Sequence, residues 1–199
     1  MRSLKLPGNK ALNRYAATGL TAAVLALVAA GASDVEIMGQ FIGEREGSRQ
    51  VAYLDGGSTS VRRIWTICKG LTHIDGKPVT PDMKLSKAEC DRHDKKELQA
   101  TLNELERIVA PEVWSTLTPP ARAGIASFCT YNIGSPKCRG STFLKLLNAG
   151  KRNEACAQIT LWIRDGGKDC RVDSSCRGQV ERRMQEDELC LHGVTWGTQ

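Results

Sequence analysis

The sequence has no Cys-x-x-Cys pair, and its three histidines, His73, His93 and His192, do not have the spacing of metal ligands. Structural zinc sites use closely spaced pairs of such residues, so we expect neither a metal nor an organic cofactor. The chain also lacks an internal repeat, a low-complexity tract and any recognised nucleic-acid-binding motif. These absences favour one ordinary folded domain with an N-terminal extension.

No acidic residue precedes Asp34, whereas four basic residues do: Arg2, Lys5, Lys10 and Arg14. Four of the 28 cationic residues and none of the 22 acidic residues therefore lie in this segment, so the net charge of +6 falls to +2 for the remainder of the chain. A nearly balanced domain lacks the basic footprint of a protein that binds phosphate groups. We therefore expect no nucleic-acid partner.

Residues Tyr15 to Ser33 carry no charge and are rich in alanine. As a helix, this segment would be about 28 Å long, which just spans the roughly 30 Å hydrocarbon core of a bilayer. It is only weakly hydrophobic, because Ala, Gly and Thr gain little from lipid. The preceding cations would keep the N-terminus in the cytoplasm and place the rest of the chain outside.

Three interpretations of this segment stay open. It could be a membrane anchor that later leaves the bilayer. It could instead be a signal peptide cut after Ala32, because Ala30-Gly31-Ala32 satisfies the small-x-small rule of signal peptidase. A buried alanine-rich core helix is the third interpretation, although the one-sided basic flank does not favour it.

We predict two parts, an N-terminal basic and anchor segment over residues 1–33 and a folded domain over residues 34–199. Apolar residues at helical spacing predict a helix from Asp34 to about Arg49, with Gly47 as a plausible stop. A turn-rich stretch and β-prone residues then predict a small hairpin or three-stranded sheet. Further helices are expected to open at Ser86, which begins a capping box, and at Thr118, with later ones over residues 142 onward, 153–162 and 179–191. The fold class is α+β, with a small antiparallel sheet near the start followed by a mainly helical lobe.

The eight cysteines all lie within the predicted domain and none lies in the N-terminal segment. An even number of cysteines after an export segment is typical of disulfides formed in an oxidising compartment. The alternative is a set of buried free thiols in a cytosolic protein. The residues concerned are Cys68, Cys90, Cys129, Cys138, Cys156, Cys170, Cys176 and Cys190.

Two carboxylates could supply the chemistry of glycoside hydrolysis. That reaction needs an acid to protonate the leaving oxygen and a second polar group on the other face of the sugar. Glu46 is expected at the end of the first helix and Asp55 at the start of a turn, so the chain could present both to one cleft. Alone, such a pair means little, because most carboxylates are solvated surface groups.

The surrounding residues add a family resemblance that covers most of residues 36–192. The motifs that carry it are Glu46-Gly47-x-Arg49-x-x-Ala52-Tyr53-x-Asp55, Trp65-Thr66-Ile67-Cys68-x-Gly70, Tyr131-Asn132-Ile133-Gly134, and Arg182-Arg183 with Glu186. In these motifs the chain resembles the phage-type lysozymes, which implies a lysozyme-like fold and a glycoside hydrolase that cuts the β-1,4 bond between N-acetylmuramic acid and N-acetylglucosamine in peptidoglycan.

The resemblance implies that Glu46 is the general acid and that Asp55 with Thr66 positions or activates the attacking water. Asn132 is a candidate for binding an acetamido group of the substrate, or it has an ordinary role in a turn or cap. The chain departs from the family in a longer stretch between Asp55 and Thr66. It also has Leu71 where the family commonly has a histidine.

The disulfides are expected between neighbours in the chain, a hypothesis that rests on proximity and on the resemblance. The expected pairs are Cys68 with Cys90, Cys129 with Cys138, Cys156 with Cys190, and Cys170 with Cys176.

The N-terminal segment is similar to the anchors of signal-arrest-release endolysins. This implies export to the host periplasm, with the chain first tethered to the bacterial inner membrane through residues 15–33 and its N-terminus in the cytoplasm. Peptidoglycan is the expected partner, and we expect a monomer. Two other functions stay open, a lytic transglycosylase that forms an anhydro sugar and a disulfide-stapled cell-wall-binding module without turnover.

Overall fold

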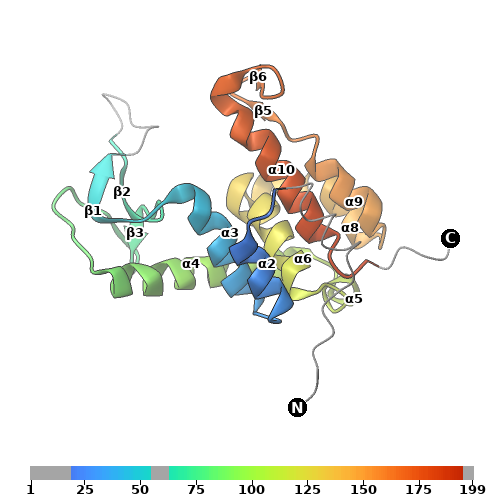
Figure 1. Cartoon of the computed structure of the whole chain (residues 1–199), viewed down its shortest axis with the longest axis horizontal. Coiled ribbons are helices and arrows are strands. Elements are labelled where there is room, and N and C mark those ends of the chain that lie inside the picture. Colours follow the sequence, from blue (N-terminus) through green and yellow to red (C-terminus); the bar gives the residue numbers. More distant parts are fainter. Residues whose placement is uncertain (1–18, 55–62, 195–199) are drawn as a thin grey trace, which may run out of the picture.

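The structure, a computed structural model, describes residues 19–54 and 63–194, apart from the side chains of residues 45 and 46. Figure 1 shows a small lobe that carries strands β1 to β4 and a larger helical lobe, connected by α3 (Asp34–Glu46) and α4 (Lys87–Ile108). The predicted α+β arrangement, with a small sheet first and helices after it, is confirmed.

The small lobe contains two separate antiparallel pairs rather than one three-stranded sheet. In the first pair, β1 (Arg49–Leu54) lies against β2 (Trp65–Cys68), with Tyr53 opposite Thr66. The second pair joins β3 (His73–Ile74) and β4 (Lys77–Pro78). Side chains of this lobe form a minor core of their own, which consists of Ala52, Ile67, Cys68, Val79 and Cys90.

Local capping chemistry sets where the two connecting helices begin and end. The hydroxyls of Ser33 and Ser86 cap α3 and α4, each in a reciprocal box with a glutamate three residues later, as predicted for Ser86. α3 ends at Glu46, before the predicted limit near Arg49. The physical reason is Gly47, which has a φ of 63°, a conformation that a side chain disfavours.

The helical lobe packs its elements around the main core. Gly124 lets α6 approach α10 closely, because a Cβ atom at this position would lie 2.5 Å from the Cβ of Leu189. The elements of this lobe are α5 (Pro111–Trp114), α6 (Pro119–Ala126), the π-helix η1 (Ser127–Asn132), α7 (Ser135–Arg139), α8 (Thr142–Asn148), α9 (Arg152–Ile159), β5 (Arg164–Asp165), β6 (Lys168–Asp169), the 3₁₀ helix η2 (Ser174–Cys176) and α10 (Arg177–Cys190).

All eight cysteines are paired, and the four expected pairings are confirmed. The Cys68–Cys90 bond ties β2 to α4, and the Cys156–Cys190 bond ties α9 to α10. The other two close short loops, Cys129–Cys138 beside η1 and Cys170–Cys176 after β6. Each bond should stabilise the fold by roughly 2 to 4 kcal/mol, mainly by restricting the unfolded chain.

Part of the uncharged N-terminal segment packs against the helical lobe as α2 (Ala22–Ala29). Leu20 and Val24 are buried in the main core. The carbonyl of Gly19 accepts a 2.7 Å hydrogen bond from the side chain of Gln185, and the hydroxyl of Thr21 donates to Glu44 of α3. No helix in residues 19–54 or 63–194 is both long enough and apolar enough to span a bilayer.

Candidate active site

The chain passes from α3 to the β1–β2 pair in the part of the sequence that holds the three predicted catalytic residues. Glu46 is the last residue of α3, although its side chain is outside the described part of the chain. Asp55 also lies outside the described residues, directly after β1. Thr66 is described, and it pairs with Tyr53 across the two strands.

The side chain of Thr66 is 3% exposed. Its hydroxyl donates to the carbonyl of Tyr53 over 3.4 Å, which is long for a hydrogen bond between two oxygens. A hydroxyl held this loosely can exchange its partner for a nearby water molecule or substrate group. Burial meanwhile limits access of bulk solvent to it.

A groove begins where β2 ends. Its first part is a cavity of about 350 Å³ between residues 69–73 and the side chains of Glu97 and Tyr131. A second cavity of about 280 Å³ shares Leu71, His73 and Glu97 with the first, so the two form one groove along α4. Leu71 and His73 both line it.

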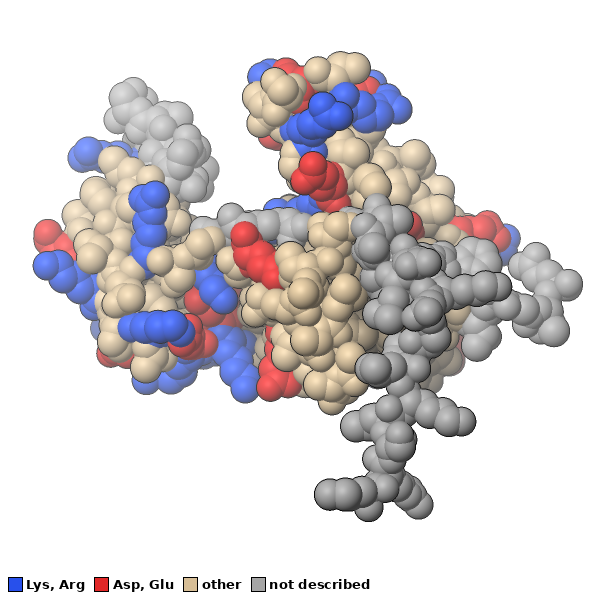
Figure 2. Space-filling view, in the orientation of Figure 1, with Lys and Arg blue, Asp and Glu red and all other residues tan. Residues whose placement is uncertain are grey.

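The groove has a mixed polar and apolar lining, as carbohydrate sites commonly do. At its far end the ammonium of Lys96 lies 2.8 Å from Asp75 and lowers the pKa of that carboxyl through a hydrogen bond. Elsewhere, Figure 2 shows the surface hollowed between the lobe that carries β1 and the β5–β6 hairpin, where cationic side chains gather. The molecule thus offers a recessed surface between its two lobes.

Asn132 is the last residue of the π-helix η1, and its amide is bonded to the protein. Its Nδ2 donates to the carbonyl of Ser127 over 3.2 Å and to the Oε1 of Glu186 over 3.4 Å. Its Oδ1 accepts from the Nη1 of Arg182 over 3.2 Å. These bonds support a structural role, and a contact with substrate stays a prediction.

One of the residues that hold Asn132, Glu186, belongs to a buried ion pair with Arg183. Arg183 and Glu186 are both 0% exposed, and the guanidinium Nη1 lies 2.9 Å from Oε2. Glu186 also accepts a 2.6 Å hydrogen bond from the hydroxyl of Ser127, at the other end of η1. α10 therefore fixes both ends of the π-helix through one carboxylate. π-Helical turns recur at functional sites, which agrees with the place of η1 beside the groove.

Three residues that line the groove, Lys69, Glu97 and Tyr131, were not among the predicted site residues. Tyr131 adjoins Asn132 in a motif that carries the resemblance, which is a usable signal. Glu97 lies on a long helix rich in surface charge, and nothing in the local pattern distinguishes it. No group of three His, Cys, Asp or Glu residues in the described chain is arranged to hold a metal ion.

Comparison with known proteins gives consistent similarities. The phage lysozyme family matches residues 43–186. A SAR-endolysin of Escherichia phage 933W is 51% identical over 92% of this chain and 99% of its own length. A probable prophage lysozyme of Escherichia coli K12 is 52% identical over 88% of this chain and 95% of its own length. An endolysin from Escherichia coli O157:H7 phage FAHEc1 superimposes with a TM-score of 0.61 at 26% identity, covering 82% of this chain and 94% of the other.

Proposed function

The chain belongs to the phage lysozyme family, and we propose on that basis that Glu46, Asp55 and Thr66 carry out the hydrolysis of peptidoglycan glycan strands. Glu46 protonates the oxygen of the leaving sugar. Asp55 and Thr66 hold and polarise the attacking water on the opposite face of the cleaved sugar. The products are glycan fragments with free reducing ends.

The observation that best supports this proposal is the β1–β2 register. It sets Thr66 opposite Tyr53, two residues before Asp55, while β1 starts three residues after Glu46. Glu46, Asp55 and Thr66 are thus all within three residues of the β1–β2 pair or part of it. A buried hydroxyl with a long bond to a carbonyl can accept from or donate to a water molecule, which fits a positioning role.

The glycan strand is proposed to lie along the groove that begins at residue 69. Tyr131 supplies an aromatic side chain and Thr72 a hydroxyl, the two group types that bind sugar faces and sugar hydroxyls. Glu97 supplies a hydrogen-bond acceptor on the opposite wall. This groove leads toward the strand that carries Thr66, so sugars bound in it would lead toward the cleavage point.

Replacing Thr66 with valine should lower kcat by roughly 10- to 100-fold on purified peptidoglycan, because valine keeps the shape but cannot hold water. The matched variant Thr66→Ser keeps the hydroxyl and should retain activity within about five-fold. Rates are followed by the release of reducing sugar. Equal activity of the valine variant and the unchanged protein would remove Thr66 from the proposed mechanism.

We also propose that the N-terminal segment has two positions. Before lysis, residues 15–33 lie in the inner membrane and tether the enzyme outside the cytoplasm. After release, the segment folds against the helical lobe as α2, where Leu20 and Val24 enter the core. The contact of Thr21 with Glu44 then adjoins the end of α3 at Glu46, so docking would order the helix that carries the acid.

Substitutions on the exposed face of α2 should affect the membrane-bound position and leave the docked position unchanged, which makes this proposal testable. Ala22, Ala23 and Ala26 are exposed in the docked helix, so leucine there should not disturb packing. In a bilayer each leucine should stabilise insertion by a few tenths of a kcal/mol or more. The triple Ala→Leu variant should therefore stay in the membrane fraction longer and delay host lysis. A triple Ala→Ser variant should release earlier.

Lysis of the leucine variant on the normal schedule would contradict the tether. So would a mature protein that begins at Ser33, because such a protein has lost α2 by cleavage.

A further inference from the structure

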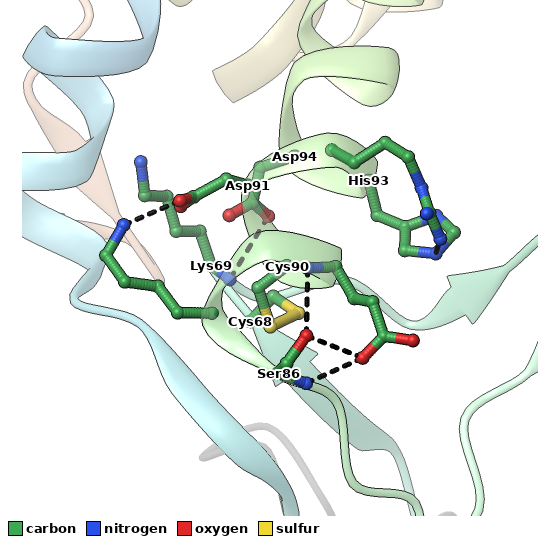
Figure 3. Close-up of a disulfide and its surroundings, with 10 residues drawn as sticks. Cys68, Lys69, Ser86, Cys90, Asp91, His93 and Asp94 are labelled. Atoms are coloured by element: carbon green, nitrogen blue, oxygen red, sulfur yellow. Dashed lines mark hydrogen bonds and ion pairs between the residues drawn. A yellow bond between two sulfur atoms is a disulfide. The ribbon is translucent and has the colours of Figure 1, made fainter.

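A buried carboxylate on α4 has no part in the mechanism described so far. Asp94 is 5% exposed and lies one helical turn after Cys90, so both residues face the end of β2 (Figure 3). Burial raises the pKa of Asp94, and the bond from the Lys69 amide partly offsets this effect. A carboxylate in such a place is costly unless it makes specific contacts, so its contacts indicate its role.

One oxygen of Asp94 holds the backbone just after β2. The Lys69 N–H donates to Oδ1 over 3.3 Å, next to the Cys68–Cys90 disulfide. The other oxygen, Oδ2, is buried with no hydrogen-bond partner among the described residues. Asp94 also lines two cavities, one of about 20 Å³ and one of about 160 Å³.

The backbone that Asp94 holds is tightly turned. Ile67 and Leu71 exchange two hydrogen bonds, of 2.9 and 2.8 Å, which close the turn. Within it Cys68 has a φ of 57°, which is uncommon for a residue with a side chain. Such a conformation persists only where the surroundings determine it. Here the determinants are the disulfide at Cys68 and the Asp94 bond at Lys69.

The Cys68–Cys90 disulfide and the hydrogen bond from Lys69 to Asp94 restrict different motions of the turn relative to α4. A disulfide alone is a pivot, because the joined segments can still rotate about its bonds. A second contact one turn further along α4 removes that rotation. Thr66 directly precedes the turn, so its orientation relative to α4 depends on both attachments.

We propose that Asp94 is a positioning residue for hydrolysis, which acts through the Lys69 amide to hold Thr66 at the site. This rests on the role proposed for Thr66. Asp94 touches neither the substrate nor the reacting water.

The test compares two variants in the full chain on a soluble peptidoglycan oligomer. Asp94→Leu loses the acceptor and should lower kcat about 10-fold with KM changed less than about two-fold. Asp94→Asn keeps an acceptor oxygen and should restore kcat to within about two-fold. Hydrogen exchange of the Lys69 amide should quicken only in the leucine variant. Asp91→Asn, a neighbouring exposed substitution on α4, is the control and should behave as the unchanged protein.

A kcat of Asp94→Leu equal to that of the unchanged protein would overturn the proposal, as would equal losses in the leucine and asparagine variants. If the leucine variant does not fold, Asp94→Ala takes its place with the same expectations. A drop in Asp94→Leu together with full activity of Thr66→Val would instead contradict the role proposed for Thr66. The two failures are therefore distinguishable.

Discussion

Replacing Glu46 with glutamine will reduce the rate of peptidoglycan hydrolysis by about 10²- to 10⁴-fold, the usual contribution of a general acid. Glutamine has nearly the same size as glutamate but cannot give a proton to the leaving oxygen. Because this change leaves the shape of the side chain nearly the same, the variant should keep its unfolding midpoint. The measurement is the initial rate of reducing-sugar release, with thermal unfolding recorded on the same sample.

Glu44 provides a matched control on the same helix. Its carboxylate accepts hydrogen bonds from the side chains of Gln40, over 2.8 Å, and Thr21, both at the protein surface. Glutamine keeps an oxygen that can accept both bonds, so the contact with Thr21 remains and Glu44→Gln should retain activity within about three-fold. If Glu46→Gln still lyses walls at the normal rate, the chain uses another acid. Glu46→Gln should still bind cell walls but no longer cut them. The unchanged protein would then differ from the variant by turnover alone, which excludes a binding module without enzymatic activity.

Replacing Glu186 with leucine should destabilise the fold by about 3–5 kcal/mol, because it removes the carboxylate that lies 2.9 Å from the buried guanidinium of Arg183. This is a large part of the roughly 5–15 kcal/mol that stabilises a typical domain. Ser127 and Asn132 lose an acceptor in the same variant. Urea unfolding of the full chain measures the change.

The double variant Arg183→Met, Glu186→Leu separates the ion pair from simple packing. The double variant removes the buried cation together with its carboxylate, so it should be more stable than Glu186→Leu alone. Asp91→Asn, which breaks an exposed pair with Lys87, should change stability by less than about 1 kcal/mol. A double variant less stable than both single ones would show that the two side chains do not act mainly on each other.

Local signals predicted much of this fold because the residues that set element ends act locally. The Ser86 capping box and the Thr118 cap need only neighbouring residues, and both begin helices as expected. The disulfide pairing also followed from proximity and resemblance. Gly47, the predicted stop, ends α3 at Glu46, and only the approximate limit near Arg49 was too late, since Arg49 starts a strand.

Features that depend on distant contacts were not predictable in the same way. The docking of α2 joins Gly19 to Gln185, residues far apart in the sequence. The bonds of Asn132 depend on α10, and no local pattern encodes them. Asp94 did leave a signal, because it interrupts an apolar stripe with Cys90 and Leu98 on α4. An acidic residue within a buried stripe is a candidate for a specific role.

The most direct test of the proposed hydrolysis is mass spectrometry of the sugars released from purified peptidoglycan by the full chain. A muramidase adds water across the cleaved bond, so the fragments should end in reducing N-acetylmuramic acid and should be labelled when the reaction runs in ¹⁸O water. Fragments that end in an anhydro sugar, lighter by one water and unlabelled, would contradict the account and identify a lytic transglycosylase.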